Sequence, residues 1–265
     1  MEAVDFMLIH TKSGLFARQE PHIGLLTYSP YSGLIYACDT ADKNLVLNWL
    51  NKKQNANIPE VYRRALGSGW YIDYKDAVYP IPHMLPIESD EWGKIIPYPK
   101  KPILINWLLT GLCPLECKYC YAEDLMRGRY TEPDSDDINF IVNSILKYDP
   151  LVVVLTGGDP LVSPFLELAI KLLHKKTGII IDTSAYNFND SHLALFKKYN
   201  VIVRISLDSE IPKVNNRLRP VKKDFKLKDK ILSNTVSAAI NAICKCIDAD
   251  VKVAVQSVAT KVNRS

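Results

Sequence analysis

The sequence lacks any apolar run long enough to cross a membrane as a helix. Its N-terminus reads Met-Glu-Ala-Val-Asp and lacks the basic start and apolar core of a secretory signal peptide. An excess of charge of one sign is also missing, because 33 Lys and Arg against 29 Asp and Glu leave a formal net charge of +4, spread along the chain. We therefore expect a cytoplasmic protein that has neither nucleic acid nor a membrane as its partner.

Cysteine is scarce as well, with six residues in 265. Three of the six are clustered, which fits a reducing compartment better than a scaffold of disulfides. With 48% hydrophobic and 23% charged residues the composition is ordinary for a globular protein. The length allows one large domain or two smaller ones.

The clustered cysteines, Cys113, Cys117 and Cys120, have the spacing C-x-x-x-C-x-x-C. Three thiolates on one tight loop can hold three irons of a 4Fe–4S cube and leave the fourth iron open. Ferredoxins close all four positions with cysteine, so an open iron implies a ligand from outside the chain. A structural zinc site is the first alternative, but zinc needs four ligands and no second cysteine pair lies nearby. Three buried structural cysteines are the second alternative, and the polar neighbours Glu116 and Lys118 fit it poorly.

This cysteine run resembles the signature of the radical S-adenosylmethionine (SAM) enzymes. The resemblance implies two cofactors, a 4Fe–4S cluster on the three cysteines and SAM, whose amine and carboxylate occupy the open iron. In that family one electron from the cluster breaks the sulfonium bond and gives a 5′-deoxyadenosyl radical. Tyr119 matches the aromatic residue that precedes the third cysteine in the family and packs near the adenine.

A glycine motif, Thr156-Gly157-Gly158-Asp159-Pro160, resembles the SAM-binding motif of the same family. Two residues without a Cβ atom let backbone groups approach the ammonium group of a ligand closely. Asp159 stands where the family often has Glu, which puts only the role of that side chain in doubt. A plain turn between a strand and a helix is the alternative for a Gly-Gly pair taken alone.

Two further segments resemble cofactor-contacting parts of the family. In Arg204-Ile-Ser-Leu-Asp208, strand alternation places Ser206 and Asp208 on one face, where they are expected near the ribose and carboxylate of SAM. Beyond it, Arg219 is expected to pair with the SAM carboxylate through its planar guanidinium. Arg217 remains an alternative for that role, and a solvent-exposed basic turn is the alternative for both arginines.

The ends of two other strands supply the last cofactor candidates. Ser184 follows the third expected strand, where the family places small polar residues that face the cofactor. Val258 leaves the fifth, where backbone atoms in the family flank the adenine. Cys244 and Cys246 occupy positions i and i+2 of an expected helix and point in different directions, which argues against a second cluster there. The stretch from Lys222 to Lys230 is expected to be a solvated loop, with contact to an acidic leader peptide as the minor alternative.

Residues 102–265 alternate between strands and helices, the pattern of a parallel sheet with crossover connections. The expected strands are Ile103–Leu109, Leu151–Leu155, Ile179–Ile181, Val201–Ile205 and Val251–Val258. We expect helices after Asp134, from Ser163-Pro164 and around Val236 to Ile243. The resemblance makes this α/β region a partial (βα) barrel with about five of six units, truncated after strand five. A shortened chain or a partner that supplies the sixth strand are both compatible with this pattern.

Residues 1–75 are expected to form a small α+β domain. Turn signals predict two hairpins, Phe6–Ile9 with Gly14–Ala17 and Gly24–Tyr28 with Gly33–Cys38, followed by two helices. This architecture resembles the winged-helix-like, PqqD-like peptide-recognition domain of peptide-modifying radical SAM enzymes. An ordinary cap for the barrel is the alternative. Residues 76–101 are rich in proline and are expected to be a semi-rigid linker.

The resemblance implies an enzyme that modifies a peptide or protein substrate, which carries a leader peptide in some of these systems. The residues resemble members related to sulfatase maturases and to enzymes of ribosomal peptide maturation. An electron donor such as flavodoxin or ferredoxin is implied too. A radical SAM enzyme for small molecules is one alternative, and a non-catalytic cluster-binding or peptide-binding fragment is another. The sequence indicates no catalytic side chain of the chain's own.

Overall fold

A computed structural model describes residues 8–10, 16–20, 24–28, 35–38, 101–123, 130–223 and 234–264. The chain divides into two compact units. The first consists of Met1–Ile105, Ser144–Val152 and Lys175–Gly178, and the second of Asn106–Asn143, Val153–His174 and Ile179–Ser265. None of the helices in the described part of the chain is long and apolar enough to span a membrane.

The first unit contains an antiparallel sheet of four strands in the order β1-β2-β3-β4. The strands are β1 (Leu8–His10), β2 (Phe16–Glu20), β3 (Gly24–Tyr28) and β4 (Ile35–Cys38). Both predicted hairpins are present, the first of them shifted toward the C-terminus by about two residues. The predicted helices of this region and residues 76–100 of the predicted linker lie outside the described residues, so the winged-helix-like assignment stays a prediction.

Arg18 on β2 is the most deeply buried charged residue among those that the structure describes in the first unit, with an exposed fraction of 0%. Its Nη1 donates to the carbonyl oxygens of Pro102 (2.9 Å) and Asp149 (2.7 Å), and its Nη2 donates to that of Lys101 (2.9 Å). Nη2 also lies 2.7 Å from Oε1 of Glu20. A buried charge is tolerated only when it is paired and hydrogen-bonded, and Arg18 meets both conditions inside this unit.

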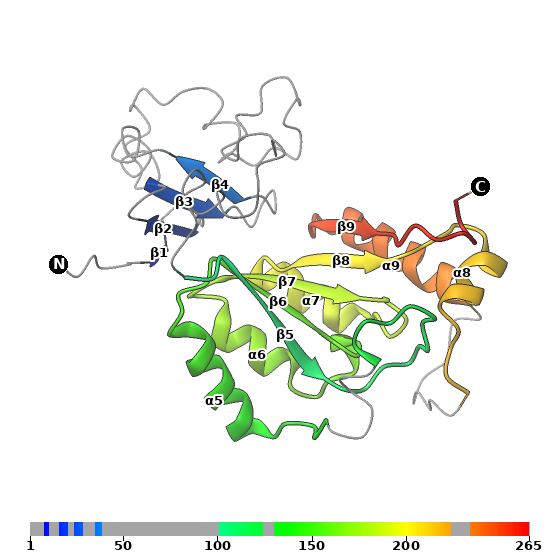
Figure 1. The fold of residues 1–265 in the computed structure, drawn as a ribbon, viewed down its shortest axis with the longest axis horizontal. Coiled ribbons are helices and arrows are strands. Elements are labelled where there is room, and N and C mark those ends of the chain that lie inside the picture. Colours follow the sequence, from blue (N-terminus) through cyan, green and yellow to red (C-terminus); the bar gives the residue numbers. More distant parts are fainter. Residues whose placement is uncertain are drawn as a thin grey trace, which may run out of the picture. The chain divides into compact units, whose positions relative to one another are not determined.

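The second sheet has five strands in the order β5-β6-β7-β8-β9, with β7, β8 and β9 joined in parallel register (Figure 1). Its strands are β5 (Leu104–Thr110), β6 (Val152–Gly157), β7 (Gly178–Thr183), β8 (Ile202–Ser206) and β9 (Val253–Gln256). This confirms the predicted α/β fold and its five strands. Every residue of β6 is buried, as expected for a central strand covered on both faces.

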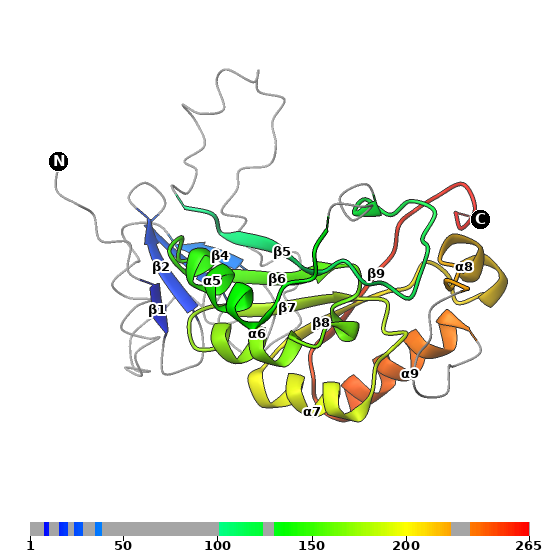
Figure 2. The same cartoon turned by 90° about the horizontal axis from the view of Figure 1, so that it is seen from below.

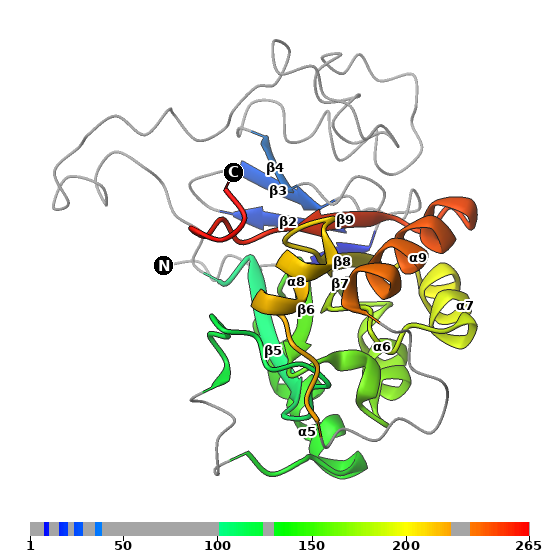
Figure 3. The same ribbon diagram turned by 90° about the vertical axis from the view of Figure 1, so that its right-hand side faces the viewer.

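Five helices accompany the strands in the described ranges: α5 (Ser135–Leu146), α6 (Leu166–Leu173), α7 (Asp190–Tyr199), α8 (Pro212–Leu218) and α9 (Thr235–Asp248). Helices α6, α7 and α9 lie on one face of the sheet (Figures 2 and 3). Asp134 caps α5 as predicted, because its Oδ1 accepts from the backbone N–H groups of Asp136 and Asp137.

Helix α8 was not predicted, and three further differences from the predicted elements concern α6, α7 and β9. Helix α6 begins at Leu166 rather than at Pro164, because Pro160–Val162 form a 3-10 turn first and Ser163 then accepts from the backbone of Phe165. Helix α7 was not predicted. Its residues are polar on average, and it begins at the capping side chain of Asn189. Strand β9 is shorter than Val251–Val258, which leaves Val258 in a loop.

Candidate functional site

The candidate residues lie where the strands of the second unit end. The cysteine run follows β5, the glycine motif closes β6, Ser184 follows β7 and Asp208 follows β8, while Val258 follows β9. In parallel sheets these strand ends meet at one edge, which is where ligands bind in such folds. The topology therefore brings all the predicted positions to the same edge of the sheet.

A second segment of the chain holds the cysteine run in place. The run and residues 218–222 pair in antiparallel fashion, with an isolated bridge between Leu115 and Val221. Three backbone hydrogen bonds complete the pairing: Glu116 N to Pro220 O (2.8 Å), Lys118 N to Leu218 O (2.9 Å) and Lys222 N to Pro114 O (2.9 Å). Leu115 is buried with Tyr186 and Ala238, and Cys113 and Cys117 pack against this small core.

The three cysteines line one cavity of about 210 Å³, together with both glycines of the motif. All three are free thiols of intermediate exposure. In the described part of the chain no three His, Cys, Asp or Glu side chains converge as ligands of a single metal ion. A cube-shaped cluster uses each thiolate on a different iron, so its ligands stand around a space instead of around a point. Three thiols on the wall of a shared cavity fit such a cluster.

The glycine motif lines the same cavity. Gly157 has a φ of 116°, a conformation that L side chains rarely adopt. A Cβ atom at Gly158 would lie 1.9 Å from the carbonyl oxygen of Leu112, and one at Gly157 would lie 2.4 Å from that of Thr110. The backbone N–H of Gly158 in turn donates to the Thr110 carbonyl (2.7 Å). Both positions therefore require glycine, because the motif lies directly against the start of the cysteine run.

Glu132 binds the segment where β5 ends and the cysteine run begins, and the sequence analysis missed it. Its two oxygens accept from Oγ1 of Thr110 and from the backbone N–H of Gly111, each at 2.7 Å. The neighbouring Tyr130 donates from its hydroxyl to the carbonyl of Leu108 at 3.1 Å. Neither residue belongs to a motif, so no sequence signal indicated them.

Burial and charge both act on the cysteine thiols. Burial, with a further contribution from Asp159, raises the pKa of Cys113 to about 12. Burial also raises the pKa of Cys117, against the opposing effect of the Arg219 guanidinium. Cluster assembly therefore requires these thiols to lose protons that the cluster-free chain holds tightly.

Asp159 joins the ends of two strands and is almost fully buried. Its Oδ1 accepts from Oγ1 of Thr183 (2.7 Å) and the backbone N–H of Leu161 (3.1 Å), while its Oδ2 accepts from the backbone N–H of Ser184 (3.0 Å) and from the Ser184 hydroxyl. The structure thus places Asp159 and Ser184 against each other rather than toward the cavity. Direct contact of either side chain with a cofactor stays a prediction.

Asp208 is the centre of a second network. Its Oδ2 accepts from Nε of Arg219 (2.8 Å) and from the hydroxyl of Tyr119, and its Oδ1 accepts from the backbone N–H of Val258 (2.9 Å). Arg219 also lies over the ring of Tyr119, with 5.5 Å between its Cζ and the ring centre, and its Nη1 is 3.7 Å from Sγ of Cys117. Burial and the hydrogen bond to Asp208 raise the pKa of the Tyr119 hydroxyl, so it stays protonated.

Polar residues of α8 and of the C-terminal loop hold the backbone of Asp208 in place. Oδ1 of Asn215 accepts from the Asp208 backbone N–H (2.9 Å), and its Nδ2 donates to Thr235 (2.7 Å). Nδ2 of Asn263 donates to the carbonyl oxygens of Asp208 (2.9 Å) and Val258 (3.0 Å). The sequence analysis gave neither asparagine a role.

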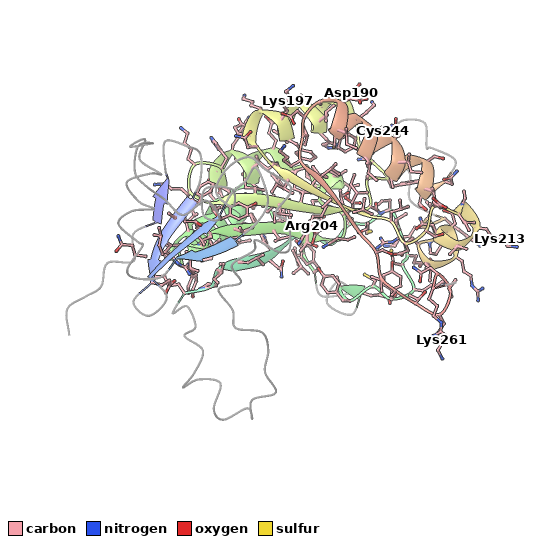
Figure 4. All side chains as sticks on the ribbon, turned by 90° about the horizontal axis from the view of Figure 1, so that it is seen from above. Asp190, Lys197, Arg204, Lys213, Cys244 and Lys261 are labelled. Atoms are coloured by element: carbon pink, nitrogen blue, oxygen red, sulfur yellow. The ribbon has the colours of Figure 1, made fainter. Side chains whose placement is uncertain are left out.

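The remaining candidates divide between the site and the surface. Ser206 is half-buried and makes no side-chain hydrogen bond to any residue that the structure describes. Arg217 is exposed on α8, so of the two arginines only Arg219 reaches the site. Cys244 is exposed on the outer side of α9 (Figure 4), whereas Cys246 is buried, which confirms that they point in different directions.

Two curated relatives match part of the chain at similar levels. The GTP 3′,8-cyclase of Rhizobium etli is 27% identical over 115 residues, which is 41% of this chain and 32% of the relative. The mycofactocin maturase MftC of Mycobacterium ulcerans is 28% identical over 122 residues, 44% of this chain and 32% of the relative. The match thus spans about a third of each relative's length.

Solved structures share the fold at low sequence identity. Streptococcus suis SuiB bound to S-adenosylmethionine has a TM-score of 0.50 and 15% identity over 96% of this chain and 65% of its own. SuiB bound to the precursor peptide SuiA has a TM-score of 0.50 and 17% identity over 96% of this chain and 64% of its own. At this identity the likeness shows the fold alone.

Residues 107–260 match the radical SAM superfamily, and this range runs from β5 past β9 and contains every candidate residue. The family uses a 4Fe–4S cluster and SAM. The cavity between the three cysteines and the two glycines fits that pair of cofactors. The chain belongs to the radical SAM superfamily, and its cofactors are a 4Fe–4S cluster and SAM.

Proposed function

We propose that this chain is the core of a radical SAM enzyme that modifies a peptide or protein substrate by abstracting a hydrogen atom. The observation that carries the radical SAM part is the cavity shared by three cysteines and a Gly-Gly wall at the strand ends. The chain spans about a third of the length of the curated relatives it matches. The activity of the whole protein is therefore part of this proposal.

When bound, the cluster and SAM supply reductive cleavage of the sulfonium bond, which yields a 5′-deoxyadenosyl radical. Cys113, Cys117 and Cys120 would hold the cluster. The backbone at Gly157 and Gly158 would receive the polar end of SAM, since both residues line the cavity that the three cysteines share. We propose flavodoxin or ferredoxin as the electron donor.

We assign the other candidates to the same cofactor. Ser206 has a free hydroxyl within the described part of the chain and would contact the ribose. Asp208 would act through the residues it orients, because its side chain has an exposed fraction of 0%. Through Val258, Asp208 holds the backbone that we expect beside the adenine. Tyr119 would support the same site through its hydrogen bond to Asp208, and Ser184 through its bond to Asp159.

Two observations support a peptide substrate. One of the two curated relatives is a maturase by name, and a structure of the same fold was solved with the precursor peptide SuiA. Among the strands that the structure describes, β4 also forms one edge of the N-terminal sheet, while β3 pairs with a strand on each side. An extended leader peptide can add to a sheet edge by backbone pairing. We therefore propose β4 as the segment that such a peptide contacts.

A small molecule is the second candidate substrate. The relative named GTP 3′,8-cyclase matches this chain as well as the maturase does. In that case the N-terminal sheet would serve as a structural cap, and a nucleotide would be the first substrate to try.

Deuterium transfer separates the two candidates. The chain is reconstituted anaerobically with iron and sulfide and supplied with SAM and dithionite. Perdeuterated peptides from any short reading frame found beside the gene are compared with deuterated GTP, and deuterium in 5′-deoxyadenosine is measured by mass spectrometry. Label from the peptide supports the proposal, and label from GTP alone replaces it with the second candidate.

Cysteine variants provide the matched control. Cys117→Ala removes a proposed cluster ligand, whereas Cys244→Ala removes an exposed cysteine of α9. We expect bound iron and 5′-deoxyadenosine to be lost in the first variant and retained in the second. Full iron content in Cys117→Ala would contradict the cluster assignment.

A further inference from the structure

We propose that Arg219 donates a hydrogen bond to the cluster ligand Cys117 and thereby raises the reduction potential of the cluster, held in position by Asp208 and Tyr119. This inference rests on the proposed cluster site. It differs from the role expected from sequence, in which Arg219 serves the carboxylate of SAM.

The geometry places the guanidinium between a carboxylate and a sulfur. Nε of Arg219 lies 2.8 Å from Oδ2 of Asp208, and Nη1 lies 3.7 Å from Sγ of Cys117, a normal separation for a hydrogen bond to sulfur. The side chains of Arg219 and Asp208 have exposed fractions of 10% and 0%. Water therefore has little access to this ion pair, and its charges are only weakly screened.

Three further contacts prevent the guanidinium from turning away from the sulfur. The ring of Tyr119 lies against its face at 5.5 Å, and the Tyr119 hydroxyl donates to the same Asp208 oxygen. The backbone N–H of Val258 occupies the other oxygen of Asp208. The carboxylate is thus held from two directions and can hold Arg219 in turn, which is how outer residues commonly orient the groups around a metal.

The direction of the effect follows from charge. Reduction adds one negative charge to the cluster and its thiolates, and a hydrogen-bond donor at Sγ of Cys117 stabilises that added charge. Hydrogen bonds to the sulfurs are among the factors that set the potentials of iron–sulfur clusters. Removing Arg219 leaves the negative Asp208 close to the cluster, whereas removing the charge of Asp208 leaves a positive Arg219 there. The two changes must therefore shift the potential in opposite directions.

The experiment measures the midpoint potential of the reconstituted cluster by spectroelectrochemistry with EPR detection, in the absence of SAM. The variants are Arg219→Gln and Asp208→Asn, with Arg217→Gln as the control for an exposed arginine two residues away. We expect Arg219→Gln to lower the ratio of reduced to oxidised cluster at a fixed potential about tenfold, which corresponds to about 59 mV for one electron. Asp208→Asn should raise that ratio, and Arg217→Gln should leave it unchanged.

Iron and sulfide analysis of each variant separates failure of this inference from failure of the proposed function. A wild-type chain that binds no cluster contradicts the proposed function itself. A full cluster with the same potential in wild type and Arg219→Gln overturns the inference alone. Shifts of the same sign in both variants also overturn it, because general loosening of the site acts in one direction. Should Arg219→Gln fail to fold, judged by thermal unfolding of the cluster-free chain, Asp208→Asn decides, and an unchanged or lowered potential there overturns the inference.

Discussion

Asp159, on the turn after β6, accepts a hydrogen bond from the Thr183 hydroxyl at the end of β7, with 2.7 Å between Oδ1 and Oγ1. This contact links the glycine motif to the neighbouring strand. Together with the bonds from Ser184 and Leu161, it makes the acidic residue of the motif a brace between two strand ends. The position of the two glycines thus depends on a carboxylate that lies behind them.

Replacing the Asp159 carboxylate is predicted to weaken the hydrogen bonds between the ends of β6 and β7 and to destabilise the fold. Asp159→Asn turns one acceptor oxygen into an N–H donor, which then faces the N–H and hydroxyl of Ser184. We expect the free energy of unfolding to fall by about 1–3 kcal/mol, the cost of a buried polar group left without a partner. Urea unfolding measures it. Asp190→Asn is the control, because Asp190 forms an exposed ion pair with Lys245 and should change stability by less than about 1 kcal/mol.

Substitutions of Gly158 and Gly157 should have different effects on cofactor binding. At Gly158 an alanine Cβ would lie 1.9 Å from the Leu112 carbonyl, so Gly158→Ala must displace the cysteine run itself. We expect reduced iron content after reconstitution. At Gly157 a φ of 116° adds to a Cβ contact of 2.4 Å with the Thr110 carbonyl oxygen, so Gly157→Val strains the end of β5 and should weaken SAM binding together with iron binding. Equilibrium dialysis with labelled SAM and iron analysis distinguish these outcomes, and unchanged SAM affinity in Gly157→Val would contradict the placement of SAM.

The cluster-free chain should lose stability at alkaline pH through Cys113. Burial raises its pKa in the folded chain to about 12, from an ordinary value of 9.0, so the folded state holds its proton more tightly than the unfolded state. The resulting stabilisation is fully present below pH 9 and is lost as the pH rises toward 12. We expect Cys113→Ser to show a shallower fall of the unfolding free energy between pH 9 and 11. If the unfolding free energies of the two proteins fell in parallel with pH, the raised pKa of the Cys113 thiol would be contradicted.

Arg18 is predicted to contribute strongly to the stability of the first unit. Arg18→Met removes the guanidinium that faces Glu20 and takes a donor away from three carbonyl groups. Breaking a buried, hydrogen-bonded ion pair typically costs about 3–5 kcal/mol. Thermal or urea unfolding measures the loss. Lys171→Met, which breaks an exposed pair with Glu167 on α6, should cost less than about 1 kcal/mol.

The sequence predicted the order of elements well because buried parallel strands are continuous apolar runs. It also placed the cysteines and glycines correctly at the strand ends. It missed α7 because that helix is polar on average, so its amphipathic pattern is weak. It placed the start of α6 too early, since a Ser-Pro pair marks both a helix start and the end of a 3-10 turn.

The partners of the site residues were beyond sequence reasoning for a physical reason. Alternation along β8 indicates on which face Asp208 lies, but not whether a ligand or Arg219 occupies its oxygens. That choice depends on residues 119, 219 and 258, which come from three distant segments. Glu132 illustrates the same limit, because it acts from outside every recognisable motif.

The pairing of the cysteine run with residues 218–222 has a consequence for biosynthesis. Cys117 precedes Arg219 by 102 residues. At a synthesis rate of roughly 5–20 residues per second, about 5–20 s pass between the two. During that interval the cysteines have left the peptidyl transferase centre, but the strand that shapes their loop does not yet exist. Loading of the cluster in its final geometry must therefore follow synthesis of α8, and the thiols of the nascent chain are exposed to oxidants until then.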